Sequence, residues 1–235
     1  MEVVFIGANN PETLRVIRAV RQVTPNFDVV GFIDNDPQKH GTEFLGYPVL
    51  GGFEQLSSLV ERKVFFVNLI TRDAVTRFQT SLSVARAGGR FANFIHPSVN
   101  LEMVSLGVGN YIQEGVILQA DVVVGNNSSI HMGSLIGHET KIGHSVFIAH
   151  GCNLSGCAKV EDGVFMGTGV SIVPRVSVGR WSVLGAGAVI VKDVPPYSVV
   201  VGNPGRVIKA TDFRGESGDI YEGRFGTGEI QPGDA

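Results

Sequence analysis

An aliphatic residue recurs at every sixth position of this chain between Leu106 and Ile190, without interruption. The fifteen members of the series are Leu106, Ile112, Leu118, Val124, Ile130, Ile136, Ile142, Ile148, Leu154, Val160, Met166, Ile172, Val178, Leu184 and Ile190. From Ile112 onward, the residue four places further along is never larger than valine. Glycine directly follows seven of the aliphatic residues, at positions 107, 125, 137, 143, 167, 179 and 185. A period of six fits neither an α-helix nor a β-strand.

These phased rules are typical of a parallel β-helix, in which each hexapeptide forms one side of a triangular coil. Eighteen residues then complete one turn, so the series predicts five turns. The aliphatic side chains point into the prism, and the small residues let the chain turn at each corner without overfilling it. Successive coils stack at the strand spacing of about 4.8 Å.

The region before the repeat has a different pattern. The segments "VVFIG", "FDVVGFID" and "VFFVNLI" predict short buried strands. A helix is expected after the first strand, with Asn10 as its N-cap and Pro11 at its first position. The segments "FEQLSSLVER" and "TRDAVTRFQTSLSVARAGG" predict two more helices, the second closed by Gly88–Gly89. This alternation indicates a small parallel α/β unit, half of a dinucleotide-binding fold.

The chain is therefore expected to contain a Rossmann-like α/β domain (1–92), a β-helix (93–209) and an extended or mobile tail (210–235). The hydrophobic content of 43% with 17% charged residues is that of a globular protein. A net charge of −3 without a basic block argues against a nucleic-acid partner. Glu2 stands where a signal peptide carries positive charge, and the apolar runs are too short to span a membrane. Cys152 and Cys157 form no C-x-x-C pair. We expect a cytoplasmic protein.

Three histidines, His138, His144 and His150, follow the same six-residue period. They fall on three different sides of one coil and should point apart, so one chain is not expected to hold a metal with them. His138 has Ala120 and Gly156 as neighbours in the adjacent coils, which leaves a hollow beside its ring.

Glu139 follows His138 and is placed to stabilise its ring. His138 is accordingly interpreted as functional. His144, expected to be exposed and paired with Asp162, and His150 are interpreted as structural. The role of His131 stays open between the two.

Several segments carry a family resemblance: "VVGFIDNDPQ" and "GYPVLGG", then "FIHPSV", the hexapeptides, and "GAGAVIVKDVPPYSVVVGNPGRVI". In this order they resemble the hexapeptide-repeat sugar acyltransferases with an N-terminal nucleotide-binding domain. Members include N-acetyltransferases of nucleotide-linked 4-amino-sugars, of the bacillosamine and perosamine type, and sialic acid O-acetyltransferases. The resemblance covers residues 1 to about 209. It implies a left-handed β-helix and a homotrimer with its sites between subunits.

The resemblance implies that His138 is a general base supported by Glu139, and that acetyl-CoA is the co-substrate, with no metal required. The implied reaction is direct acetyl transfer to a nucleotide-linked amino-sugar of the 4-amino-4,6-dideoxy type, for surface polysaccharide or glycan synthesis. O-acetylation of sialic acid or another polysaccharide sugar is the alternative. The implied acetyl-CoA residues are Gly156, Thr168, Gly185, Ala186, Gly187, Lys192, Pro204 and Arg206. The implied nucleotide-sugar residues are Gly7, Ala8, Asp34, Asn35 and Asp36.

The chain departs from the family pattern at two places. Its first βα turn, "GANNPET", has one glycine and no histidine, where the family carries a glycine-rich turn. Phe147 occupies the position nine residues after the base, where some members have a second histidine. Two functions of other classes are also considered: a trimeric zinc hydratase with histidines shared across an interface, and a non-catalytic sugar-nucleotide-binding protein.

Overall fold

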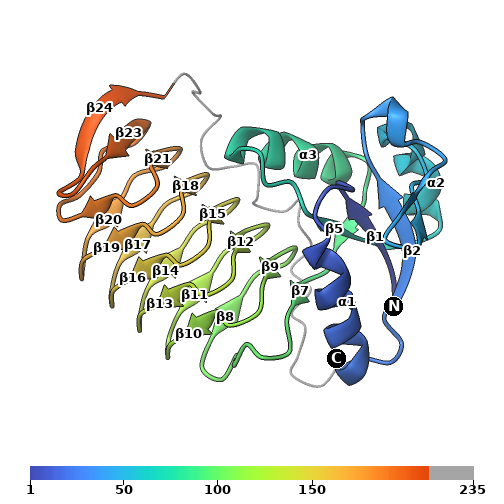
Figure 1. Cartoon of the computed structure of the whole chain (residues 1–235), viewed down its shortest axis with the longest axis horizontal. Helices are drawn as coiled ribbons and strands as arrows, with labels where there is room; N and C mark the ends of the chain where they lie inside the picture. The colour runs from blue at the N-terminus through green and yellow to red at the C-terminus, as the bar shows by residue number, and fades with distance from the viewer. Residues whose placement is uncertain (212–235) are drawn as a thin grey trace.

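The computed structural model describes residues 1–211 and consists of a small α/β domain joined to a parallel β-helix (Figure 1). The predicted tail lies outside the described residues, except for Ala210 and Thr211. In residues 1–211 there is no helix of the length and apolarity needed to cross a membrane.

The α/β domain is a four-stranded parallel sheet in the order β2-β1-β5-β6. Its strands are β1 (Glu2–Ile6), β2 (Asp28–Ile33), β5 (Phe65–Asn68) and β6 (Arg90–Phe91). Its helices are α1 (Glu12–Val23), α2 (Leu56–Glu61) and α3 (Ala74–Arg86). The short elements η1 (Pro37–Lys39), β3 (Glu43–Phe44), β4 (Tyr47–Pro48) and η2 (Phe53–Gln55) complete it. The three strands and three helices predicted for this region are all present.

The start of α1 shows how the sequence sets a helix boundary. Asn10 Oδ1 accepts a hydrogen bond from the main-chain N–H of Glu12 at 2.9 Å, but the N-cap position is held by Pro11, so the prediction of Asn10 as N-cap is wrong by one residue. The helix itself begins at Glu12, one residue later than predicted. Pro11 precedes it with helical backbone angles.

The β-helix presents three faces, and almost every strand is two residues long (Figure 1). One face holds β8 (Ser105–Leu106), β11 (Val123–Val124), β14 (Lys141–Ile142), β17 (Lys159–Val160) and β20 (Ser177–Val178). The second holds β10 (Ile117–Leu118), β13 (Leu135–Ile136), β16 (Asn153–Leu154), β19 (Ser171–Ile172) and β22 (Val189–Ile190). The third holds β7 (Phe94–Ile95), β9 (Tyr111–Ile112), β12 (Ser129–Ile130), β15 (Phe147–Ile148), β18 (Phe165–Met166), β21 (Val183–Leu184), β23 (Ser198–Val201) and β24 (Arg206–Ala210).

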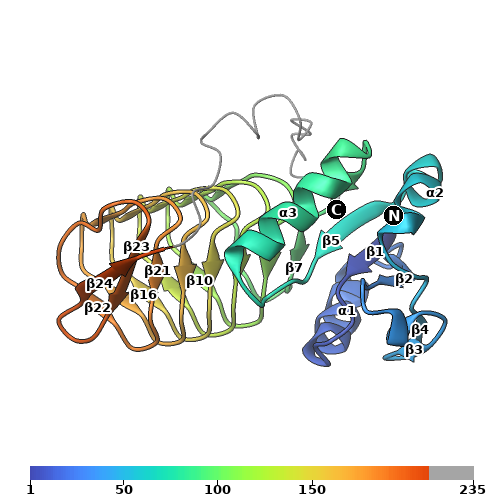
Figure 2. The ribbon, with the colours of Figure 1, turned by 90° about the horizontal axis from the view of Figure 1, so that it is seen from above.

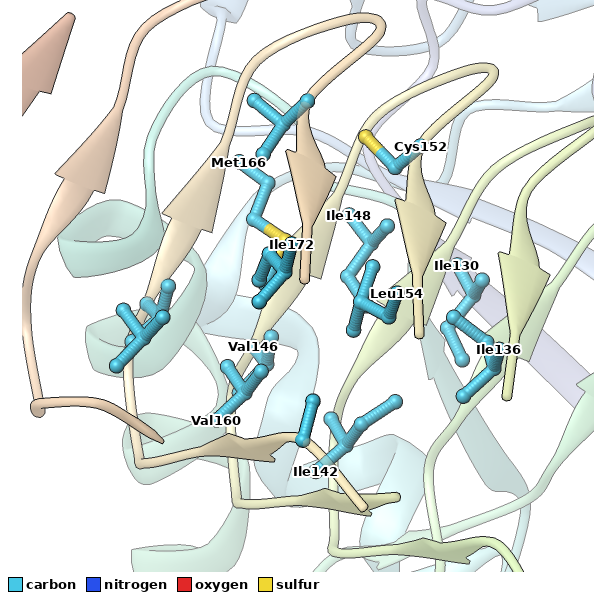
Figure 3. Packing of buried hydrophobic residues seen from close by; sticks show 14 of the residues in the cluster. Ile130, Ile136, Ile142, Val146, Ile148, Cys152, Leu154, Val160, Met166 and Ile172 are labelled. Carbon is cyan, nitrogen blue, oxygen red and sulfur yellow. The ribbon is translucent and has the colours of Figure 1, made fainter. Parts of the chain in front are cut away.

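The interior follows the hexapeptide rules closely. Every aliphatic residue of the series from Ile112 to Ile190 is buried, and Leu106 is partly buried. Figure 3 shows part of this interior, including the series from Ile130 to Ile172. The small residues are buried too, and the polar ones among them are hydrogen-bonded. The Ser128 hydroxyl, for example, donates to the carbonyl of Gly143 at 2.9 Å, in the next coil. A polar side chain is tolerated there because the adjacent backbone supplies an acceptor.

The helix is longer than the predicted five turns. Its third face has seven parallel strands, which enclose about six turns, and β24 adds an antiparallel edge. The six-residue period did not predict the extra strands, because the spacing between paired strands differs from eighteen residues at both ends of the β-helix. Phe94 of β7 pairs with Tyr111, seventeen residues on, and Val183 of β21 pairs with Val199, sixteen residues on.

Helix α3 connects the two domains by running along the β-helix (Figure 2). Phe78 of α3 packs edge-on against Trp181, with ring centroids 5.3 Å apart. The guanidinium of Arg77, fully buried, donates from Nε to the carbonyl of Asn127 (3.0 Å) and from Nη1 to the carbonyl of Asn68 (2.8 Å). These contacts hold the loop after β5 against the β-helix.

Candidate active site

His138 lies in the turn between β13 and β14, at one corner of the prism. Its main-chain N–H donates to Gln119 Oε1 at 2.9 Å, and its carbonyl accepts from the N–H of Cys157 at 2.8 Å. The backbone is thus fixed to the coils on both sides. The side chain is 57% exposed and can be reached by a substrate.

The His138 ring packs against Gly156, so the space that the sequence predicted beside the ring is filled by the ring itself. A β-carbon at position 156 would lie 2.5 Å from His138 Nε2 and 2.8 Å from Cε1, well inside van der Waals contact. The ring therefore occupies the space that the missing side chain leaves. This is a packing requirement for glycine that is independent of any need for an unusual backbone angle.

Glu139 orients the imidazole. Its Oε2 lies 2.9 Å from His138 Nδ1, and the Cys157 thiol donates to the same oxygen at 3.6 Å. The hydrogen bond with His138, followed by that with Cys157, lowers the pKa of the Glu139 carboxyl, so the group stays ionised. An ionised carboxylate only accepts hydrogen bonds, and the neutral imidazole must carry its proton on Nδ1. The lone pair of Nε2, beside Gly156, is then free to accept a proton.

The ligand atoms of His138, Glu139 and Cys157 all lie within 4.8 Å of one another. Within residues 1–211 this is the one such group, and a nitrogen, oxygen and sulfur donor set is one that zinc accepts. The hydrogen bond to Glu139 already uses His138 Nδ1. His144 and His150 lie in other turns of the coil, as the six-residue spacing predicted.

His144 is half-buried, and the expected exposed ring paired with Asp162 is wrong in that respect. Its Nδ1 accepts from the main-chain N–H of Asn126 at 2.8 Å, and the Asp162 carboxylate accepts from the main-chain N–H of His144 at 2.7 Å. Burial lowers the pKa of His144, and the nearby Asp162 charge acts in the opposite direction. The side chains at these positions hold adjacent coils together.

A pocket of about 530 Å³ lies between the α/β domain and the third face of the β-helix. Asn10 and Thr71 line it from the loops after β1 and β5. In this sheet the strand order reverses beside β1, which is where ligands bind in open α/β folds. The β-helix contributes His131, Phe147, Ala149, His150, Phe165, Gly167, Thr168, Val183, Leu184, Gly185 and Ala186.

His131, whose role the sequence left open, is the buried polar residue of this pocket. Its side chain is 2% exposed and packs against Phe147 and His150, with ring centroids 4.7 and 5.0 Å away. Burial, followed by the electrostatic effect of His150, lowers the pKa of His131 to about 3. The ring is therefore neutral at physiological pH.

The five residues expected to bind the nucleotide-sugar lie together around the carboxyl ends of β1 and β2. Partial burial opposes ionisation of Asp34, yet hydrogen bonds from Lys39, Ala8 and Asp36 hold the pKa of its carboxyl below the usual value. Lys39 Nζ lies 2.8 Å from Asp34 Oδ2 and 2.5 Å from Asn9 Oδ1. Asn35 Oδ1 accepts from the main-chain N–H of Phe53 at 3.1 Å. Lys39 was not predicted as a site residue, because only the fold of the short helix η1 brings it back onto Asp34.

The residues expected to bind acetyl-CoA fall into three groups. Thr168, Gly185 and Ala186 line the pocket, and Gly187 is the turn residue that follows them. Gly156 lies at the His138 corner. Lys192, Pro204 and Arg206 are exposed on the last coil and its terminal hairpin: Lys192 follows β22, Pro204 precedes β24, and Arg206 begins it. His138 is not among the residues that line the pocket, so within one chain the pocket and the His138–Glu139 pair are separate.

Two solved structures that superpose on this chain are acetyltransferases. PerB from Caulobacter crescentus, determined with CoA and GDP-perosamine, superposes with a TM-score of 0.79 at 28% identity, covering 89% of this chain and 98% of PerB. The acetyltransferase domain of PglB from Neisseria gonorrhoeae has the same fold, with a TM-score of 0.78 at 24% identity over 88% of this chain and 99% of that domain.

Sequence relatives match mainly the repeat region. The bifunctional protein GlmU of Thermotoga maritima is 35% identical over 130 residues, which is 48% of this chain. The chain spans only 29% of the length of that relative. No family model matches the chain. The structural and sequence relatives together confirm the predicted resemblance to hexapeptide-repeat sugar acyltransferases with an N-terminal α/β domain.

Proposed function

We propose that this chain transfers the acetyl group of acetyl-CoA to the amino group of a nucleotide-linked amino-sugar of the 4-amino-4,6-dideoxy type. The observation that carries the proposal is the His138–Glu139 pair, which leaves Nε2 unprotonated beside Gly156. PerB, with its similar fold and domain order, was crystallised with CoA and GDP-perosamine, and this supports the choice of substrates.

His138 acts as the general base in this mechanism. The sugar amine attacks the thioester carbonyl, a C–N bond forms, and Nε2 takes the proton that the nitrogen loses. The C–S bond then breaks, and the CoA sulfur leaves as a thiolate that the imidazolium can protonate. Glu139 stabilises the imidazolium through Nδ1, because a carboxylate at 2.9 Å favours the charged ring.

The site is completed by a second copy of the chain in this proposal. His138 and the pocket are separate in one chain, and a homotrimer would bring His138 of one subunit to the pocket of the next. Thr168, Gly185, Ala186 and Gly187, with Gly156, would line the acetyl-CoA path. Lys192, Pro204 and Arg206 would cover its adenine and phosphates, since the two cations are exposed there.

The α/β domain would hold the nucleotide. Its glycine-poor turn gives the phosphates few main-chain donors, and Lys39 supplies a cation at the same edge of the sheet. Gly7, Ala8, Asp34, Asn35 and Asp36 surround that edge. We assign the nucleotide-binding role to this group of residues.

Acetyl transfer to a defined panel of acceptors tests the proposal. The panel contains GDP-perosamine, UDP- and dTDP-linked 4-amino-4,6-dideoxy-sugars, their 4-hydroxy counterparts, and free sialic acid. CoA thiol release and the product mass are measured. We expect acetylation of at least one amino-sugar nucleotide and none of its 4-hydroxy counterpart. Thiol release with none of the amino-sugars, or transfer to sialic acid alone, would contradict the proposal.

A further inference from the structure

The pocket between the two domains contains a buried polar atom that the fold leaves without a partner. His131 Nδ1 has no hydrogen-bond partner among the described residues, although the ring is almost completely buried. Buried polar atoms in native proteins are nearly always hydrogen-bonded, so an exception next to a pocket points to a ligand atom. The ring itself borders the pocket.

The other ring nitrogen indicates which kind of ligand atom is missing. His131 Nε2 lies 3.0 Å from the hydroxyl of Ser129, which is fully buried. When Ser129 donates its hydrogen to Nε2, both groups are satisfied and the ring proton sits on Nδ1. Nδ1 is then a donor that needs an acceptor, such as the oxygen of a hydroxyl or a carbonyl.

The residues that line the pocket indicate which class of ligand it can bind. The lining residues include no aspartate, glutamate, lysine or arginine, and two of them are the phenylalanines Phe147 and Phe165. Such walls fit a neutral ring with hydroxyl groups and an apolar edge, and they offer nothing to a phosphate. Asn10 and Thr71 place the pocket directly beside the edge of the sheet where the nucleotide is proposed to bind.

We propose that His131 is a specificity-determining residue for the acceptor, in which Nδ1–H donates a hydrogen bond to an oxygen of the deoxy-sugar seated against Phe147 and Phe165. The inference rests on the proposed function and adds to it the location of the sugar and a role for the neutral histidine. Burial keeps the His131 ring uncharged. In this proposal His131 therefore only donates a hydrogen bond, and His138 alone acts as the base.

Three variants and three probes test this role. His131→Phe keeps a ring but removes Nδ1–H, His131→Asn restores a short N–H donor, and Ser129→Ala frees the ring tautomer while leaving the ring in place. Binding of GDP-perosamine, GDP and acetyl-CoA is measured by calorimetry on the full chain. Where the wild type prefers a UDP- or dTDP-linked amino-sugar, that sugar and its nucleotide replace the GDP pair. Thermal unfolding of each variant accompanies the measurement.

We expect the variants to weaken binding of the sugar part of the ligand and to leave binding of the nucleotide part unchanged. His131→Phe weakens binding of the amino-sugar nucleotide about tenfold, the cost of one unpaired hydrogen bond, while nucleotide and acetyl-CoA affinities stay within about twofold. His131→Asn recovers part of the loss, and Ser129→Ala gives a smaller loss of the same kind. If the phenylalanine variant fails to fold, the asparagine and alanine variants still give the comparison.

Other results would overturn the inference. A loss of acetyl-CoA affinity would show that acetyl-CoA, and not the sugar, occupies the pocket beside His131. Equal losses for the nucleotide and the nucleotide-sugar, or no loss at all, would make His131 a core residue. If the wild type itself binds no nucleotide-sugar and acetylates none, the proposed function fails. If it acetylates normally with and without His131, the inference alone fails.

Discussion

The imidazole of His138 lies directly over the α-carbon of Gly156, one coil further along the β-helix. A β-carbon at position 156 would come within 2.5 Å of Nε2, which is the atom proposed to take the proton. Gly156 therefore determines the position of the His138 ring, although it contributes no side chain.

Gly156→Ala should lower kcat at least about tenfold while changing stability by less than about 1 kcal/mol, because the exposed ring can swing away from the new methyl group. Steady-state kinetics and urea unfolding measure the two effects. In a His138→Ala background the same substitution should cost no further activity. A full additional loss in that background would show that Gly156 acts independently of His138.

The buried His131 predicts an acid-dependent loss of stability. Its pKa is about 3 in the folded protein, against the ordinary histidine value of 6.5, so the unfolded chain binds more protons between these pH values. Stability should then fall as the pH drops below about 6.5, by at most about 1.4 kcal/mol per pH unit from this group.

Urea unfolding of the wild type and His131→Phe between about pH 7 and pH 4 measures this contribution. The wild type should lose more stability than the variant over the range, because the variant lacks the titrating ring. His144, which also has a lowered pKa, is common to both proteins and cancels in the comparison. Parallel pH profiles would contradict the assignment of a buried neutral His131.

Arg77 predicts a strong link between the two domains. Arg77→Ala removes donors to the carbonyls of Asn68, Ile70 and Asn127, and should lower the free energy of unfolding by about 3 kcal/mol. Arg86→Ala, on the exposed part of the same helix, is the matched control and should cost less than about 0.5 kcal/mol. Similar small effects from both substitutions would show that Arg77 contributes little to domain docking.

The His138, Glu139 and Cys157 group allows a direct test of metal involvement. Acetyl transfer should be unchanged by a chelator, because the proposed base works through a proton-accepting nitrogen, and Cys157→Ser should change kcat by less than about threefold. Activity is measured after dialysis against the chelator, with and without added zinc. Loss of activity that zinc restores would favour the metal-dependent alternative.

The repeat made most of the β-helix predictable, because each hexapeptide position has one structural role. The aliphatic positions are buried as predicted from Ile112 to Ile190. The ends were not predictable in this way. Where β7 and β23 pair with the rest of the β-helix, the spacing departs from eighteen residues. These strands are paired through main-chain hydrogen bonds, which leave no periodic pattern of side chains in the sequence.

The candidate site was predictable in part. The environment of His138 followed from counting eighteen residues forward to Gly156, since strand pairing fixes that register. The pocket depends on how the α/β domain packs against the β-helix, so Asn10 and Thr71 gave no local signal of their part in it. His131 became distinctive only once its burial and its unpartnered nitrogen were known.

The central claim is that His138 accepts the proton in acetyl transfer to an amino-sugar nucleotide, and single-turnover transfer by His138→Ala tests it most directly. Labelled acetyl-CoA and the best amino-sugar nucleotide of the panel are mixed with wild type and variant, and the acetylated product is quantified. The account predicts a rate lower by about 10²- to 10⁴-fold with acetyl-CoA affinity retained. Transfer at an undiminished rate would contradict it.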